Sequence, residues 1–269
     1  MALPFIPSDA ALLGLQAGVV FAPRQAPRIA KLERLRGPGW AVVPIASIVL
    51  VVFAIRFVSD TATGLTYLAL VAVPLLAAVA LGWACRGSRP SAALAVVPLF
   101  LIAWIAHHSL AGEAAAALLS ALSCVTLGVL LSMVTPARWL KLGILLMACA
   151  DTWLVVSDLL QAPNATLVAA QPGGGLPRLQ SEIFGSVSMG YGDLFVAALL
   201  GAVMAGDVGK QREAALLTLA IAAVFDLLFL VVNELPATVP VALALVAVEA
   251  LSALRRPSRR ADAIPLRAR

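Results

Sequence analysis

Charged residues are scarce in this chain: only 12% of its 269 residues are Asp, Glu, Lys or Arg. A soluble domain carries about 25% charged residues, so the shortage excludes an ordinary soluble enzyme or binding domain. The only two histidines, His107 and His108, are adjacent and would point to different faces of a helix, which makes a poor metal site. The three cysteines form no CxxC motif and no even-numbered disulfide framework. We therefore expect no metal and no organic cofactor.

Apolar sequence is what the chain has in abundance, at 62% of its residues. A helix needs about 20 apolar residues to cross the hydrocarbon core of a bilayer. Eight apolar runs approach that length, at residues 40–58, 65–85, 92–107, 114–134, 140–160, 183–205, 214–232 and 235–254. The sequence therefore predicts an all-α fold, a polytopic transmembrane helix bundle of eight or nine spans in contact with the lipid bilayer.

Residues 2–22 are the candidate for the ninth span. They precede a basic cluster, which is the charge order of a segment whose N-terminus is translocated. The segment is apolar except at three positions, Ser8, Asp9 and Gln16. The alternative is a short interfacial helix broken by Pro4 and Pro7, because the run that remains after these prolines is short for a span.

Basic residues gather on alternate connections between the predicted spans. All of the 19 Lys and Arg residues except Arg56 and Arg178 lie before the first of the eight spans or after the second, fourth, sixth or eighth. Cytoplasmic loops carry an excess of Lys and Arg, so the C-terminal tail is predicted to be cytoplasmic. The net charge of +5 is then a topology signal, and nucleic acid is not expected as a partner. We expect a multi-pass protein of the cell membrane of a bacterium.

Four regions follow from this layout. Residues 1–39 form an N-terminal segment with the possible extra span and a basic stretch, and residues 40–134 form a four-span scaffold. Residues 135–255 form a second four-span half, and residues 256–269 a basic cytoplasmic tail. The long connection at 161–181 is rich in Pro and Gly and is expected to be extracytoplasmic.

Two acids interrupt the apolar runs of the second half. Asp151 lies midway along the predicted span 140–160, and Asp193 lies midway along the next span, 183–205. An ionised carboxylate at bilayer depth is costly, so such acids are functional candidates and usually have a partner. In antiparallel neighbouring helices the two carboxyls can meet and share a proton, one acting as general base on water and the other as acid. The pair predicts the dyad of an aspartyl protease.

The residues around the second acid carry a family resemblance. Residues 189–195 read MGYGDLF, which resembles the GxGD motif of the presenilins and signal peptide peptidases, the intramembrane aspartyl proteases. Asp151 falls where that family has its Tyr-Asp motif one span earlier, with Ala150 in place of the tyrosine. Gly190 and Gly192 lack side chains, so we expect a neighbouring helix or a substrate backbone to approach Asp193 there.

A third element of the resemblance lies two spans after GxGD. Pro236, Ala237 and Thr238 stand where the family has a Pro-Ala-Leu motif, with Thr238 in place of the leucine. The resemblance covers residues 140–254. The predicted orientation is similar to that of the signal peptide peptidase branch, and a ninth span would complete the family's usual count.

The resemblance implies an intramembrane aspartyl protease that hydrolyses peptide bonds of transmembrane helices or signal peptides. Asp151 and Asp193 would be the catalytic pair. Six further residues would contact or position the substrate, namely Gly190, Tyr191, Gly192, Pro236, Ala237 and Thr238. The partners would be transmembrane peptides.

Three other functions stay open at this point. A transporter or proton relay is the main alternative, because Asp226 is a third acid in mid-span and Arg56 lies near a membrane face. Asp226 could instead be a structural partner of Arg56. Prepilin peptidases also use GxGD, but they typically place a basic residue after the acid, where this chain has Leu194. GYGD also ends potassium-channel filters, but Met189 stands where that filter has valine.

Overall fold

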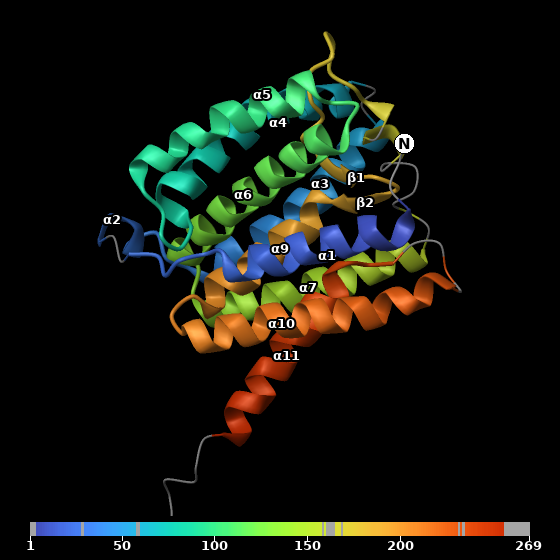
Figure 1. Cartoon of the computed structure of the whole chain (residues 1–269). Helices are drawn as coiled ribbons and strands as arrows, with labels where there is room; N and C mark the ends of the chain where they lie inside the picture. The colour runs from blue at the N-terminus through green and yellow to red at the C-terminus, as the bar shows by residue number, and fades with distance from the viewer. Residues whose placement is uncertain are drawn as a thin grey trace, which may run out of the picture.

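The computed structural model describes residues 4–27, 30–57, 60–157, 159, 165–167, 169–230, 232 and 235–255. Helices make up most of this part of the chain, which confirms the predicted all-α class (Figure 1). The α-helices are α1 Phe5–Phe21, α2 Ala30–Glu33, α3 Val43–Phe57, α4 Thr61–Val79, α5 Val96–Ile105, α6 Leu110–Val134, α7 Ala137–Val156, α9 Tyr191–Met204, α10 Val208–Phe225 and α11 Thr238–Leu254. Short 3₁₀ and π segments extend four of them, at η1 Pro38–Val42, η2 Ala80–Ala84, η3 Pro90–Ala95 and η4 Asp226–Leu230.

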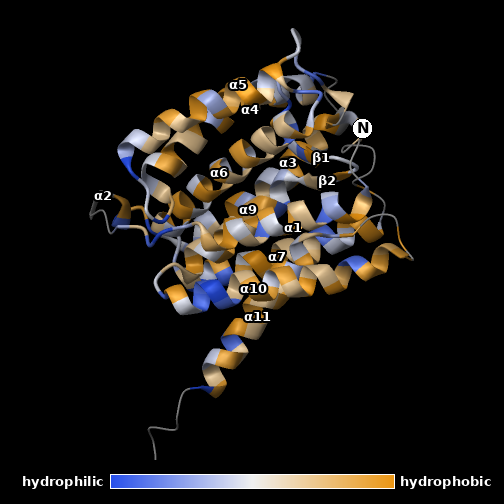
Figure 2. Ribbon diagram, viewed as in Figure 1, coloured by the Kyte–Doolittle hydropathy of each residue, from blue (hydrophilic) through white to orange (hydrophobic). Residues whose placement is uncertain are grey.

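Several of these helices suit a membrane. Four are long and apolar enough to cross one, at Thr61–Ala84, Leu110–Val134, Ala137–Val156 and Val208–Leu230. Shorter apolar helices occupy Phe5–Phe21, Pro90–Ile105, Tyr191–Met204 and Thr238–Leu254. Figure 2 shows apolar residues along the outside of the bundle and a gathering of hydrophilic residues where α10 begins. The chain is thus a helical membrane protein, while the count of eight or nine spans stays a prediction.

The predicted helix at 183–205 is wrong over its first third. Residues there form a hairpin of two strands, β1 Ser181–Phe184 and β2 Val187–Gly190, paired antiparallel with Glu182 opposite Met189. Gly185 turns the chain with φ +62°, a left-handed conformation that glycine adopts without strain. Side chains alternate between the two faces of a strand, which buries Glu182 and Met189 and leaves Ser188 exposed. The helix α9 therefore begins only at Tyr191.

The core forms where α9 packs between α6 and α1. A Cβ at Gly128 of α6 would lie 2.9 Å from the carbonyl oxygen of Ala198 on α9, and a Cβ at Gly201 of α9 would overlap the Val20 carbonyl of α1. Glycine at these two positions lets the helix backbones approach closely. Helix α1 buries Ser8, Leu12, Gln16 and Val19 along one stripe, so it is an integral helix of the bundle and is not broken at Pro7. Proline is tolerated in the first turn, where no intrahelical donor is lost.

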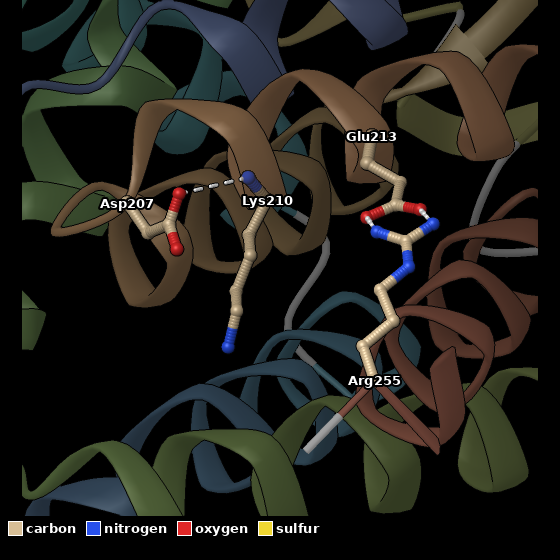
Figure 3. A network of polar contacts seen from close by, with 4 residues as sticks. All are labelled: Asp207, Lys210, Glu213 and Arg255. Atoms are coloured by element: carbon tan, nitrogen blue, oxygen red, sulfur yellow. Dashed lines mark hydrogen bonds and ion pairs between the residues drawn. The ribbon is translucent and has the colours of Figure 1, made fainter. Parts of the chain in front are cut away.

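Polar contacts join the helices at the end of the bundle where α10 begins, which we term the basic end. Lys141 of α7 pairs with Glu249 of α11 at 2.7 Å. Figure 3 shows the Glu213 carboxylate of α10 facing the Arg255 guanidinium, with N–O distances of 2.9 and 3.2 Å. In the same view Asp207 caps α10 by accepting from the Lys210 backbone N–H at 3.1 Å. Such exposed pairs contribute little each, about 0–1 kcal/mol.

The side chain of Gln211 also joins helices at the basic end. Gln211 is fully buried, and its Nε2 donates to the carbonyls of Val20, Pro23 and Gly201 at 2.9–3.1 Å. Its Oε1 accepts from the Arg86 guanidinium. One side chain thus joins α1, α9 and α10 to the segment that follows α4, while the site described next lies toward the opposite end of the bundle.

Candidate active site

Asp151 lies in the last two turns of α7, where Thr238 of α11 hydrogen-bonds to it. The Thr238 hydroxyl donates to Asp151 Oδ2 at 2.6 Å. Thr238 is only 5% exposed, so this bond is shielded from water. Hydrogen bonds to a charged group are short and stronger than those between neutral groups. The contact fixes one oxygen of Asp151 and leaves its other oxygen for a different partner.

Asp193 is the third residue of α9 and caps the start of that helix. Its Oδ2 accepts from the backbone N–H of Gly190 at 3.0 Å. A carboxylate in the first helical turn also interacts favourably with the helix dipole. The prediction that Asp193 lies midway along a span is therefore wrong, because the hairpin takes the place of the preceding helical turns. Capping alone would hold the residue in place, so this contact by itself does not make the acid catalytic.

The structure places the two acids within electrostatic range of each other. Helix α7 packs against α9, and the carboxyls of Asp151 and Asp193 are near enough to interact electrostatically. At about 1.5 Å of rise per residue, Asp151 lies about 21 Å along α7 from its basic end, and Asp193 lies about 17 Å along α9 from its basic end. The two carboxyls thus share a depth, as antiparallel neighbours should, although neither is in the middle of its helix.

The segment that leads into α11 positions Thr238 beside Asp151, and a residue of α1 holds this segment in place. Gln16, which is 1% exposed, donates from Nε2 to the carbonyl of Ala237 at 3.0 Å. Pro236 is buried beside it, and Ala237 stands at the N-terminal cap of α11. Sequence reasoning noted Gln16 only as a polar interruption. Its role depends on a contact between residues at opposite ends of the chain, which no local pattern reveals.

The two glycines of the GxGD motif do not serve helix packing. A Cβ at Gly192 would meet nothing within 4 Å, and one at Gly190 would meet only the carboxyl of Asp193, at 3.0 Å. Both glycines are exposed, and Asp193 next to them is half-buried. The expectation that a neighbouring helix approaches here is wrong, because these residues precede or begin α9. They leave an open face beside the acid.

Tyr191 points away from that face and anchors α9 to α6. Its hydroxyl shares a 2.7 Å hydrogen bond with the Ser123 hydroxyl, and its carbonyl accepts from the Cys124 thiol at 3.7 Å. The hairpin is tied to the same helix, because the Gly185 N–H donates to Glu113 Oε2 at 2.8 Å. Tyr191 is therefore a positioning residue in this structure, and α6 is the frame on which the start of α9 rests.

A second pair of acids lies apart from the first. The carboxyls of Asp226, in η4, and Asp9, in α1, lie near enough to each other to interact. Asp9 had no predicted role. The predicted partner of Asp226 was Arg56, whose side chain falls outside the described residues. Over the described ranges, no group of three or more His, Cys, Asp or Glu side chains is arranged to hold a metal ion.

Comparison of the chain with protein-family models, with curated protein sequences and with solved structures gives no match.

Proposed function

We propose that this protein is an intramembrane aspartyl protease similar to the presenilins and signal peptide peptidases. The observation that carries the proposal is the meeting of Asp151 and Asp193 at one depth, from two packed apolar helices. Two carboxyls in such a position cannot both ionise at low cost, so they share one proton. A shared proton supplies a general base and a general acid at the same site.

The reaction would proceed through a water held between the two carboxyls. The ionised carboxyl takes a proton from this water as its oxygen attacks the scissile carbonyl carbon, and the protonated carboxyl donates to the carbonyl oxygen, giving a gem-diol. Collapse of the gem-diol breaks the C–N bond: the proton taken from water passes to the leaving amine, and one gem-diol hydroxyl returns its proton to the other carboxyl, which leaves a carboxylic acid and restores the shared proton. Thr238 and the Gly190 N–H would hold the two carboxyls in orientation throughout.

The substrate would be a transmembrane helix that has locally unwound, because a helical peptide bond is shielded by its own turn. Two features support this. Gly190 and Gly192 leave space beside Asp193. In addition, β2 leads directly into Gly190 and pairs with β1 along one edge, and within the described chain no strand pairs with its other edge, where an extended peptide could add.

The test is cleavage of a single-span peptide by the purified protein in liposomes. Asp151→Asn and Asp193→Asn should each abolish cleavage without unfolding the protein, because the members of a dyad act as a unit. Asp226→Asn is the matched control, since it neutralises another acid among apolar helices and should retain cleavage. A wild-type protein that cuts no membrane peptide, or a dyad variant that still cuts, would refute the proposal.

The facing carboxyls of Asp9 and Asp226 favour a second candidate, a transporter or proton relay. Intramembrane acid pairs mark proton paths in pumps and transporters. This candidate predicts a proton flux into liposomes that is lost in Asp9→Asn and in Asp226→Asn. Flux without any peptide cleavage would favour it over the protease, and an absence of flux would remove it.

A further inference from the structure

Glu182 is a buried acid that the proposed reaction does not use. It lies in β1, is 1% exposed, and neither of its carboxyl oxygens has a hydrogen-bond partner among the described residues. The Ser120 hydroxyl is nearby but donates to the Leu179 carbonyl at 3.1 Å. Buried polar groups are hydrogen-bonded in the great majority of cases, so an unpartnered carboxyl demands an explanation.

Several acids surround the hairpin, and two basic side chains, Arg178 and His107, line a small cavity beside β1 together with Glu113, Ser181 and Ile183. The titratable groups on the described helices packed against β1 are Glu113 and Cys124 on α6 and Asp9 on α1, and α9, which packs against β2, adds Tyr191 and Asp193. Helices α1, α6 and α9 and strand β2 carry no Lys, Arg or His. Burial, with the nearby Asp193 charge adding to it, raises the pKa of Glu182 to about 8. A buried carboxylate without a counter-charge is very costly, so the protonated form prevails at neutral pH.

We propose that Glu182 is a third carboxyl of the candidate active site, a positioning residue whose charge state controls how firmly Asp151 and Asp193 keep their shared proton. The hairpin register places Glu182 opposite Met189, next to the Gly190 that caps α9, and Glu182 interacts electrostatically with Asp193. This inference rests on the proposed function for its catalytic meaning. The coupling between the two carboxyls can be measured without it.

The sign of the effect follows from the charges. Protonated Glu182 adds no charge beside Asp193, whereas ionised Glu182 adds a negative charge and opposes loss of the proton that the dyad shares. The wild-type dyad therefore keeps its proton to higher pH than a dyad beside a permanently neutral side chain. In Glu182→Gln the alkaline limb of kcat/KM should move to lower pH by on the order of one pH unit, as expected for two nearby charges at the effective dielectric of proteins.

The first experiment compares pH profiles of peptide cleavage for wild type, Glu182→Gln and Glu113→Gln. Glu113 also contacts the hairpin, through the Gly185 N–H, so it is the matched control and its variant should keep the wild-type profile. Glu182→Gln should match wild type on the acid side and lose activity earlier on the alkaline side. An unchanged alkaline limb in Glu182→Gln would overturn the inference, because a merely structural glutamate would not move it.

The second experiment needs no activity. Infrared difference spectra of wild type against Glu182→Gln should show a protonated carboxyl at neutral pH, and its titration midpoint should fall by on the order of one pH unit in Asp193→Asn, where the repelling charge is gone. A carboxyl that is already ionised at neutral pH, or a midpoint that Asp193→Asn leaves in place, would overturn the inference. If the spectra behave as expected but wild type cuts nothing, the protease proposal fails and the coupling of the two carboxyls stands.

Discussion

The hydroxyl of Thr238 and Oδ2 of Asp151 are 2.6 Å apart, which joins the start of α11 to the last turns of α7. Asp193, on α9, is held from a different direction by the Gly190 N–H. Each acid thus has one oxygen fixed by a donor of its own. This arrangement orients both carboxyls, so replacing either donor should disturb the site.

Thr238→Val should lower cleavage without unfolding the protein. Valine keeps the shape of threonine but cannot donate to Asp151, and a hydrogen bond to a charged group is worth about 1.5–3 kcal/mol, so kcat/KM should fall roughly 10- to 100-fold. Thr238→Ser keeps the hydroxyl and should stay within about 3-fold of wild type by the same reasoning. Equal activities of the valine and serine variants would show that the hydroxyl plays no part.

Gln16→Leu should destabilise the bundle. The variant leaves the partly buried Ala237 carbonyl without its donor, and an unsatisfied acceptor away from water costs about 1–3 kcal/mol. Thermal unfolding in detergent should therefore begin at a lower temperature than in wild type. Gln25→Leu is the control, since Gln25 is exposed and its replacement should change stability by no more than about 0.5 kcal/mol. Indistinguishable melting of the two variants would contradict the assigned role of Gln16.

Gly192→Ala and Gly201→Ala should separate activity from folding. The Gly192 position has room for a methyl group, so its variant should fold normally and lose cleavage, because the methyl group occupies the open face beside Asp193. At Gly201 the methyl group would overlap the Val20 carbonyl, so that variant should be destabilised by about 1–3 kcal/mol through overpacking. Circular dichroism melting and peptide cleavage measure the two effects. A Gly192→Ala protein with full activity would mean that substrate does not pass over this face.

Glu182 should make the stability of the protein depend on pH. Its pKa is raised from 4.5 to about 8 by burial, so the folded state holds a proton that the unfolded state releases. This contribution to stability is fully present below about pH 4.5 and is lost as pH rises through about 8. The melting temperature of wild type should therefore fall relative to Glu182→Gln between these limits. If the melting temperatures of the two proteins changed in parallel from about pH 4 to 9, Glu182 would have the same pKa in the folded and unfolded states.

The two ends of the bundle should report opposite sides of the membrane. The basic end joins Arg86, Lys141, Lys210 and Arg255, whereas Gly174 lies in the connection that precedes the hairpin. A reporter inserted at Gly174 should be extracytoplasmic, and one fused after the tail should be cytoplasmic. Cysteine accessibility in intact cells is an independent measurement. Reporters on the same side would mean that the number of spans between them was miscounted.

The sequence alone determined that this chain is a helical membrane protein with acids in its apolar segments. Hydropathy reports the cost of transferring a segment out of water, and that cost is nearly independent of where the segment packs. The same property explains the error at residues 183–190, since a short apolar run is equally compatible with a helix and a strand. The surrounding helices favour a hairpin there, and α6 and α1 both supply polar contacts that hold it.

The tertiary structure decided which polar groups meet. Thr238 reaches Asp151, Gln16 reaches Ala237, and Asp9 faces Asp226, all across long stretches of chain. No periodicity encodes such pairs, because each depends on the relative rotation of two packed helices. The burial of Glu182 follows likewise from the hairpin register, in which a shift by one residue would have turned that carboxyl to the other face.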